Sequence, residues 1–335
     1  MPLPNAVTGA CSYAALERAL LDDLESVGNG LDRPVWVIVP TNLVALHLQR
    51  LIADATGGML GIRFMRLQDA ATEMAATSLA NRRMQPLPAG ARELVLERAL
   101  KNLPDESCYA EFREFPGSVR TLTRAMDLLQ HALWTPALLR EASAESAENP
   151  RPNLSELAHL WGELREFKER ERFYGPNDLL RAGAEGAALD PPAGVVLYGL
   201  YDLTTLQSSL VRRIAGQADS FRAYLLWQED TRGDPLPGFE YAAPTVRLFK
   251  ELTGQQTVEC IDETSESSDL ACLQRTIFSE ADRGDKAPKT DSLPLFDQPD
   301  GSVEIVNCPG KISEAEELVR EILRRFGTEK APESA

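Results

Sequence analysis

The polar corners that directly follow apolar runs are the places where this sequence could carry out chemistry. One corner is Gly-Leu-Tyr-Asp at 199–202, immediately after the apolar run Val-Val-Leu-Tyr at 195–198. In an ATPase built on a parallel sheet, a metal-binding aspartate and a glutamate stand at the end of such a strand. Here those two positions hold Tyr198 and Gly199, or Gly199 and Leu200, depending on the register. Asp202 is the single acid of this corner, and one acid cannot both bind magnesium and position the attacking water.

A second polar corner, at residues 8–12, stands where a phosphate loop would stand. A working loop has the form G-x-x-x-x-G-K-[ST], and its lysine neutralises the β- and γ-phosphates. Counted from Gly9, the final Gly-Lys-Ser/Thr would fall on residues 14–16, which are Ala-Ala-Leu. We therefore predict an ordinary strand-to-helix turn, no bound cofactor and no ATP hydrolysis. The degenerate nucleotide site would consist of Thr8, Gly9, Ser12 and Asp202.

Other candidate sites are weaker. Cys-Pro-Gly-Lys-Ile-Ser at 308–313 resembles a phosphate loop, but its first glycine is absent and isoleucine follows the lysine. His47 has no carboxylate or cysteine at ligand spacing, so we interpret it as a packed or surface residue. No C-x-x-C pair occurs, which argues against a zinc or iron–sulfur centre in this chain, and we predict no metal site. The odd, dispersed set of cysteines indicates free thiols in a reducing compartment, and we expect a cytoplasmic protein. The cysteines are Cys11, Cys108, Cys260, Cys272 and Cys308.

The totals describe an acidic globular chain of 335 residues, with 43% hydrophobic and 26% charged residues. No apolar run is long enough for a membrane helix, and the amino terminus lacks the basic start and apolar core of a secretory signal. The net charge of −16 argues against a large, sequence-independent grip on phosphates, although it leaves room for a local basic groove.

The elements that position these corners alternate between strands and helices. Continuous apolar runs such as Val-Trp-Val-Ile-Val at 35–39 are typical of strands buried on both faces of a parallel sheet. We predict an α/β fold in which one mainly parallel sheet contains the strands near 35–39, 61–67, 195–198 and 224–227. Ligands of such sheets bind at the carboxyl ends of the strands, where the two corners lie.

Between the second and third of these strands, 61–67 and 195–198, the pattern becomes purely helical. We predict a helical insertion lobe over 91–189 between two parts of the sheet domain, 1–90 and 190–280. Its Glu/Arg-rich run at 163–172 reads as a solvated helix face. Residues 281–335 would hold a linker, a strand at 303–306 and a helix at 313–326. Further expected elements are a strand near 257–261, a helix at 270–278 and a capping box made by Ser313 and Glu316.

Four segments together resemble the amino-terminal part of a helicase–nuclease subunit of the AddB/RexB type. This family is similar to UvrD-like superfamily 1 helicases and carries a carboxyl-terminal PD-(D/E)XK nuclease. The segments are VWVIVPTNLVALHLQRLI (35–52), LSELAHLWGELREFKERERFYGPNDLL (154–180), VVLYGLYDLTTLQSSLVRRIA (195–215) and VEIVNCPGKISEAEELVREI (303–322). Asp178 matches the turn that closes the family's helical insertion, and Asp202 matches the last acidic position of its strand motif.

The resemblance implies a RecA-like sheet with an inactivated ATP site and a role in DNA repair by homologous recombination. It implies a domain that binds or scans single-stranded DNA and supports a motor subunit, without catalytic residues of its own. Residues 281–335 would then be a linker and the start of a second RecA-like domain. The rest of that domain and the family's exonuclease activity would lie beyond these residues, so the chain would be a fragment. DNA-contact candidates are Thr41, Asn42, Arg63 and Arg66.

Further side chains could assist at the carboxyl edge of the sheet. The Arg82-Arg83 pair could add charge, and Tyr198, Tyr201 and Trp36 are stacking candidates if they are exposed, although an apolar strand favours a core role for Trp36. Two other hypotheses stay open: a degenerate nucleotide fold that binds only protein partners, which the acidic charge favours, and an active ATPase, which the missing lysine opposes.

Overall fold

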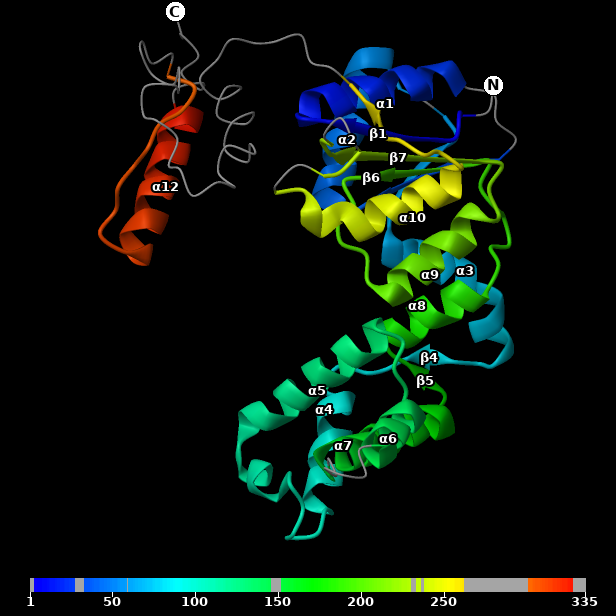
Figure 1. Cartoon of the computed structure of the whole chain (residues 1–335), viewed down its shortest axis with the longest axis vertical. Helices are drawn as coiled ribbons and strands as arrows, with labels where there is room; N and C mark the ends of the chain where they lie inside the picture. The colour runs from blue at the N-terminus through cyan, green and yellow to red at the C-terminus, as the bar shows by residue number, and fades with distance from the viewer. Residues whose placement is uncertain are drawn as a thin grey trace, which may run out of the picture. The chain divides into compact units, whose positions relative to one another are not determined.

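The chain is built on a six-stranded, entirely parallel sheet in the order β3-β2-β6-β7-β1-β8. The computed structural model describes residues 3–27, 33–58, 60–145, 152–229, 233–235, 238–261 and 301–327. The fold class is therefore α/β, as predicted, and the four strands predicted to share one parallel sheet do share it (Figure 1). The strands are β1 (Ala6–Ala10), β2 (Val35–Val39), β3 (Ile62–Arg66), β6 (Gly194–Tyr198), β7 (Ser220–Leu226) and β8 (Glu259–Cys260).

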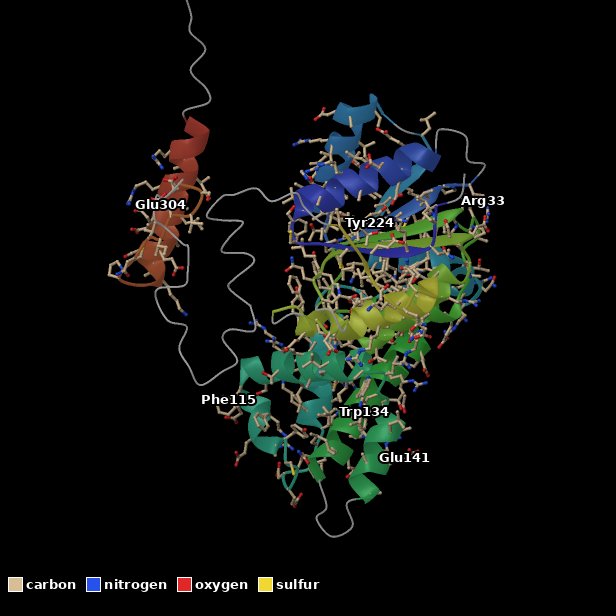
Figure 2. The ribbon with its side chains drawn as sticks, turned by 45° about the horizontal axis from the view of Figure 1, so that its top comes forward. Arg33, Phe115, Trp134, Glu141, Tyr224 and Glu304 are labelled. Carbon is tan, nitrogen blue, oxygen red and sulfur yellow. The ribbon has the colours of Figure 1, made fainter. Side chains whose placement is uncertain are left out.

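The central strands are buried on both faces, which explains why they read as unbroken apolar runs. In β2, Val35, Val37 and Val39 belong to one core cluster, while Trp36 and Ile38 belong to the cluster on the opposite face. Side chains fill the space on both sides of the sheet (Figure 2). Trp36 is fully buried, so it is a core residue and is excluded as a stacking group.

Helices cover both faces of the sheet. On one face lie α1 (Tyr13–Val27) and α2 (Asn42–Thr56), whose leucines join the cluster that contains Val37 and Tyr198. On the other face lie α3 (Leu67–Asn81), α8 (Pro176–Glu185), α9 (Thr205–Ala215) and α10 (Ala243–Thr253) (Figure 1). This two-sided cover is what a parallel sheet requires, because neither of its faces is polar.

The residues between β3 and β6 include helices with a hydrophobic core of their own. Leu96, Met126, Leu160 and Trp161 are buried in this third cluster. Its elements are α4 (Ala91–Lys101), η1 (Ala110–Glu114), α5 (Pro116–His131), α6 (Pro136–Glu145) and α7 (Pro152–Glu171). A short parallel pair, β4 (Gln85–Pro86) and β5 (Phe173–Tyr174), lies at the entry and exit of this group.

Helix α8 packs against α3 and α9 rather than within this helical group. Leu180 accordingly belongs to the core cluster of the sheet, together with Leu206 and Leu210 of α9. Gly183 allows the close approach, because an added Cβ would lie 3.0 Å from the backbone of Ala71. By its contacts α8 is thus part of the helical layer of the sheet, although it falls within the 91–189 range assigned to the insertion.

Residues 264–335 form a second compact unit by their internal contacts, and within it residues 301–327 are described. The predicted helix is present as α12 (Lys311–Gly327), but the predicted strand at 303–306 is wrong, because these residues have no strand partner among those described. Ser313 lies inside α12 and does not begin it, so the predicted capping box is also wrong. The predicted helix at 270–278 lies outside the described residues. Among the described helices, none combines the length and apolar character needed to cross a membrane.

Candidate functional site

The turn between β1 and α1 is too short to hold a phosphate. Strand β1 ends at Ala10 and α1 begins at Tyr13, which leaves only Cys11 and Ser12 between them. Ser12 Oγ accepts a hydrogen bond from the Ala15 N–H at 3.3 Å, so it caps the helix. The sequence prediction of an ordinary strand-to-helix turn is therefore confirmed.

Thr8 and Gly9 are strand residues and line no cradle. A Cβ built on Gly9 would lie 2.9 Å from Val258 Cγ1 and 3.1 Å from the Trp227 carbonyl, so the position is packed by protein. The Gly9 and Ala10 carbonyls already accept bonds from Ile261 and Trp227 in the neighbouring chain segments. Thr8 and Gly9 are thus part of the packed sheet, and their backbone is engaged by neighbouring chain segments.

A pair of tyrosines closes the carboxyl edge of the sheet above this turn. Tyr201 Oη lies 3.3 Å from Tyr13 Oη and accepts a hydrogen bond from the Leu226 N–H at 3.2 Å. The Tyr201 ring also lies near Tyr241, with their centroids 6.2 Å apart. Burial, with the hydrogen bond to Tyr13, raises the pKa of Tyr201 above its usual value. Tyr13 and Tyr241 remain 48% and 58% exposed, so two aromatic faces are open to solvent here.

The corner after β6 is fixed by backbone geometry. Gly199 has φ 68°, a conformation that favours glycine, and its N–H donates to the Tyr224 carbonyl at 2.9 Å. Asp202 is exposed in the following loop, two residues before Thr204 caps α9. Tyr198 is only 3% exposed, so it is not available for stacking, and burial raises its pKa. Of the three predicted stacking groups, only Tyr201 is partly open to solvent.

The predicted DNA-contact residues occupy two different places. Thr41 caps α2 by accepting a hydrogen bond from the Val44 N–H at 3.3 Å, and Asn42 follows it; both are exposed. Arg66 pairs with Val39 in the register, so it lies beside them at the carboxyl edge. Arg63 pairs with Trp36 near the other end of β3 and forms an ion pair with Glu73, so it does not join them.

Arg66 is engaged by a carboxylate. Its Nε and a terminal nitrogen each lie 3.0 Å from an oxygen of Asp69. The hydrogen bonds from Arg66 lower the pKa of the Asp69 carboxyl, so the pair stays charged near neutral pH. A phosphate would have to compete with Asp69 for this guanidinium, which makes Arg66 a weaker candidate than its position alone indicates.

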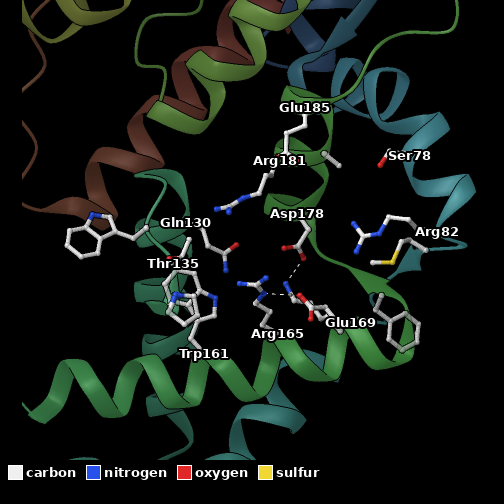
Figure 3. Close-up of a pocket in the computed structure, with 16 residues that line it drawn as sticks. Ser78, Arg82, Gln130, Thr135, Trp161, Arg165, Glu169, Asp178, Arg181 and Glu185 are labelled. Atoms are coloured by element: carbon white, nitrogen blue, oxygen red, sulfur yellow. Dashed lines mark hydrogen bonds and ion pairs between the residues drawn. The ribbon is translucent and has the colours of Figure 1, made fainter. Parts of the chain in front are cut away.

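A groove lined by arginines, which sequence reasoning did not assemble, lies where α3, α7 and α8 meet. One part of it is a cavity of about 230 Å³, and the guanidinium groups of Arg82, Arg165 and Arg181 point into it from three different helices or helix ends (Figure 3). Trp134, Trp161 and Phe173 supply aromatic walls. Two adjoining depressions share Arg82 with this cavity. Together they carry seven cationic and three acidic side chains among the described residues: Arg82, Arg83, Arg165, Lys168, Arg172, Arg181 and Arg213, with Glu169, Asp178 and Glu185.

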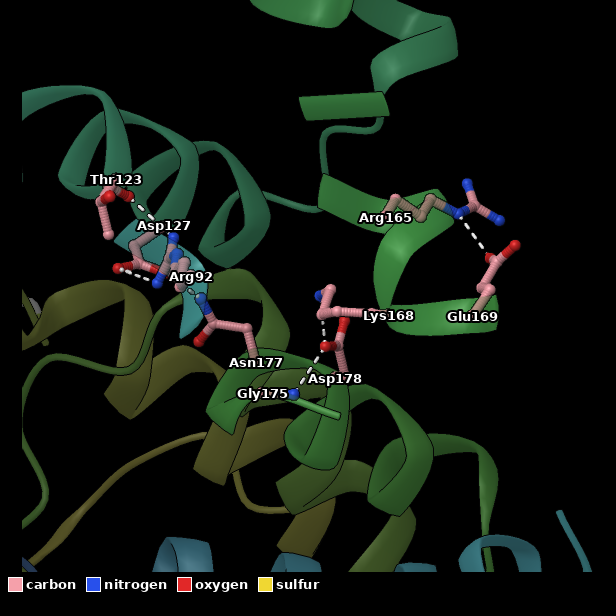
Figure 4. Close-up of polar contacts among 9 residues, drawn as sticks. All are labelled: Arg92, Thr123, Asp127, Arg165, Lys168, Glu169, Gly175, Asn177 and Asp178. Atoms are coloured by element: carbon pink, nitrogen blue, oxygen red, sulfur yellow. Dashed lines mark hydrogen bonds and ion pairs between the residues drawn. The ribbon is translucent and has the colours of Figure 1, made fainter. Parts of the chain in front are cut away.

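Polar contacts hold the walls of this groove in place. Lys168 of α7 forms an ion pair with Asp178 of α8, whose carboxylate also accepts the Gly175 N–H at 2.8 Å (Figure 4). Asp178, which the sequence marked as the closing turn of the insertion, is therefore a structural cap between α7 and α8. Arg165 forms an ion pair of 2.8 Å with Glu169 on the same helix (Figure 4).

A second cluster ties α8 to α4 and α5. Both terminal nitrogens of Arg92 contact the Asp127 carboxylate, at 3.1 and 3.0 Å, and Arg92 also donates to the Thr123 carbonyl (Figure 4). Asn177 Nδ2 donates to the same carboxylate at 2.8 Å. Asp127 thus connects three helices, and its contacts are structural.

Within the described residues, no three His, Cys, Asp or Glu side chains converge as a metal site would require. Among the described residues, Cys11, Cys108, Cys260 and Cys308 are not in disulfides, and Cys272 lies outside the described residues. His47 is a surface residue that contacts Glu17 at 2.8 Å. In comparisons with known proteins, no family model and no curated protein matches the chain.

Proposed function

We propose that this chain is a non-catalytic, RecA-like domain that binds single-stranded DNA and supports a motor subunit in a helicase–nuclease that processes DNA ends. The fold that supports this proposal is a parallel α/β sheet with helices on both faces and a helical group inserted between β3 and β6. The sequence resemblance to the AddB/RexB type supplies the biological setting, which includes DNA repair, a cytoplasmic location and a nuclease domain elsewhere in the protein.

The closed turn between β1 and α1 carries the non-catalytic part of the proposal. Phosphoryl transfer needs a backbone cradle, a lysine and a metal-holding acid. In their places stand a two-residue turn, tyrosine hydroxyls and the exposed Asp202. A sheet that keeps its architecture while its nucleotide position is filled by side chains is suited to binding rather than hydrolysis.

The carboxyl edge offers groups that single-stranded DNA could use. Tyr13 and Tyr241 present exposed rings, and bases stack on such rings without sequence preference. Thr41 and Asn42 begin α2 at the same edge, where backbone N–H groups can meet a phosphate. Arg66, the predicted cation at this edge, is already paired with Asp69, so we expect only ~2–4 phosphates to be neutralised, with a salt slope of roughly −1.4 to −2.8.

The test is a salt titration of fluorescently labelled oligo-dT with this chain, from about 50 mM to about 200 mM salt. We expect weak binding at the low end that fades at the high end, and weaker binding for the Tyr13→Ala/Tyr241→Ala double variant. Leu43→Ala is the matched control. Leu43 is exposed and follows Asn42, so this substitution removes exposed apolar surface at the same edge but no aromatic ring. No binding by the parent chain at low salt would overturn the DNA-binding function.

The second candidate is a scaffold that binds only protein partners. It is favoured by the net charge of −16 and by the carboxylates that already occupy Arg63 and Arg66. Retained binding to a motor subunit by a chain that binds no DNA would support it.

A further inference from the structure

The arginine-lined groove between α3, α7 and α8 contains guanidinium groups that no carboxylate neutralises. Among the described residues, Arg82, Arg83, Arg172 and Arg181 form no ion pair, and neither does Arg213, whose Nε donates to the Gly186 carbonyl, whereas Arg165 and Lys168 in the same groove are paired. In a chain with a net charge of −16, five cations without an ion pair among the described residues, at adjoining cavities, are a local reversal of sign. Such a reversal concentrates anions at that place.

Two of these arginines occupy backbone positions that favour glycine. Arg83 has φ 52° and Arg172 has φ 59°, both in the left-handed region. Arg83 follows α3 in a Schellman arrangement, since Met84 N–H bonds to the Leu79 carbonyl and Arg83 N–H bonds to that of Ala80. Glycine is the usual residue at this position because it has no Cβ to strain.

The two strained arginines are also neighbours in space. Arg172 directly precedes β5, and Arg83 precedes β4 with Met84 between them. The two strands are paired, and the Gln85 N–H donates to the Arg172 carbonyl at 2.8 Å. Both line the depression that shares Arg82 with the main cavity. Strained non-glycine residues tend to cluster at functional sites, because the function then depends on the side chain.

The groove combines its cations with aromatic surface. Trp134 and Phe173 are partly exposed and line the same cavity as Arg82 and Arg181. Guanidinium groups bind phosphate oxygens, and ring faces accept unstacked bases. A duplex keeps its bases stacked inside and an acidic peptide has none, so this combination fits a single strand best.

We propose that Arg82, Arg83, Arg172 and Arg181 bind successive phosphates of a single nucleic-acid strand in this groove. Trp134 and Phe173 contact its bases. This inference rests on the proposed function and adds to it a second contact surface, away from the carboxyl edge of the sheet. It also gives the junction between the sheet layer and the helices α4–α7 a role in binding rather than in support alone.

The decisive variant is Arg83→Gly/Arg172→Gly, measured against the parent chain by oligo-dT salt titration. Removal of two of the four groove contacts should reduce the magnitude of the parent's salt slope by about 1.4 and weaken binding at least tenfold at about 50 mM salt. Glycine relieves the left-handed backbone at both positions, so the urea midpoint of the variant should equal or exceed that of the parent. Loss of binding together with retained stability separates a binding role from a folding role.

Two controls complete the design. Arg18→Gln/Arg50→Gln removes the same charge from exposed side chains on α1 and α2, on the opposite face of the sheet, and should leave the slope unchanged. Arg83→Lys/Arg172→Lys keeps the charge and should restore the slope. Poly-glutamate and duplex DNA should compete poorly with oligo-dT.

Each contrary result has a distinct meaning. Binding by the parent with an unchanged slope in the glycine variant would overturn this inference and leave the edge site in place. If the Arg18→Gln/Arg50→Gln variant lost as much of the slope as the glycine variant, or if poly-glutamate competed as well as oligo-dT, binding would depend only on net charge. Either result would also overturn this inference. No binding by the parent would overturn both this inference and the proposed function.

Discussion

The hydroxyl oxygens of Tyr13 and Tyr201 lie 3.3 Å apart, beside the two-residue turn where a nucleotide-hydrolysing protein would hold phosphates. Tyr201 comes from the corner after β6 and Tyr13 from the start of α1, so the pair connects the two polar corners of the carboxyl edge. The same hydroxyl of Tyr201 accepts the Leu226 N–H at the end of β7. Tyrosine side chains therefore lie at this part of the carboxyl edge, and ATP hydrolysis requires a lysine and a metal-holding acid instead.

The first prediction is that the chain has no magnesium-dependent ATPase activity. The turn after β1 provides neither a lysine nor a backbone cradle, so bound ATP would not be activated. The measurement is phosphate release with and without single-stranded DNA, with Asp202→Ala as the comparison. A rate above background that disappears in Asp202→Ala would contradict the prediction.

The second prediction contrasts two tyrosines that face each other across β6 and β7. Tyr198 and Tyr224 are paired in register, with ring centroids 6.4 Å apart. The Tyr198 hydroxyl is buried without a hydrogen-bond partner among the described residues, whereas the Tyr224 hydroxyl donates to Asp23. We expect Tyr198→Phe to raise the free energy of unfolding by up to about 1 kcal/mol, and Tyr224→Phe to lower it by about 1.5 kcal/mol or more. Urea unfolding measures both, and equal effects of the two variants would refute the contrast.

The third prediction concerns Asp127, which accepts hydrogen bonds from Arg92 and Asn177. Asp127→Ala leaves both donors without their acceptor in a half-buried place, so we expect a loss of about 2 kcal/mol in the free energy of unfolding. Glu97→Ala is the matched control, because it removes an exposed carboxylate that pairs with Lys101 on the surface of α4, and should cost less than about 0.5 kcal/mol. Similar losses in both variants would show that the Asp127 cluster adds nothing specific.

The fourth prediction is a loss of stability in alkali. Burial raises the pKa of Tyr198, Tyr201 and Tyr224 in the folded chain, whereas an unfolded tyrosine titrates near pH 10. Below that pH the tyrosines are protonated in both the folded and the unfolded chain, so their contribution to the free energy of unfolding is fully present. Above it the unfolded chain releases protons first, so stability falls by up to about 1.4 kcal/mol per pH unit for each buried tyrosine.

Urea midpoints between about pH 8 and about pH 11 measure this effect, with tyrosinate absorbance to follow ionisation. Tyr201→Phe should make the loss of stability with rising pH less steep, because one of the three buried tyrosines that cause it is removed. A decline that begins well below pH 10 would identify other titrating groups as its cause.

The sequence by itself determined the layers of this protein and the ordinary turn between β1 and α1. An unbroken run such as 35–39 can be satisfied only by burial on both faces, so the strands and their parallel arrangement follow from local pattern. The absence of a phosphate-loop lysine at residues 14–16 can likewise be read directly from the amino-acid sequence. The predicted strand at 303–306 failed because an apolar run gains a strand's hydrogen bonds only from a partner, and none of the described residues supplies one.

Tertiary structure alone decided which charges are free. Arg63 and Arg66 looked like DNA contacts, but folding brings Glu73 and Asp69 to them. The run at 163–172 is a solvated helix face, as predicted, and it also forms one wall of a groove with Arg82 and Arg181, which are distant in sequence. Coulombic partners depend on distances through space, and these are set by how α3, α7 and α8 pack rather than by spacing along the chain.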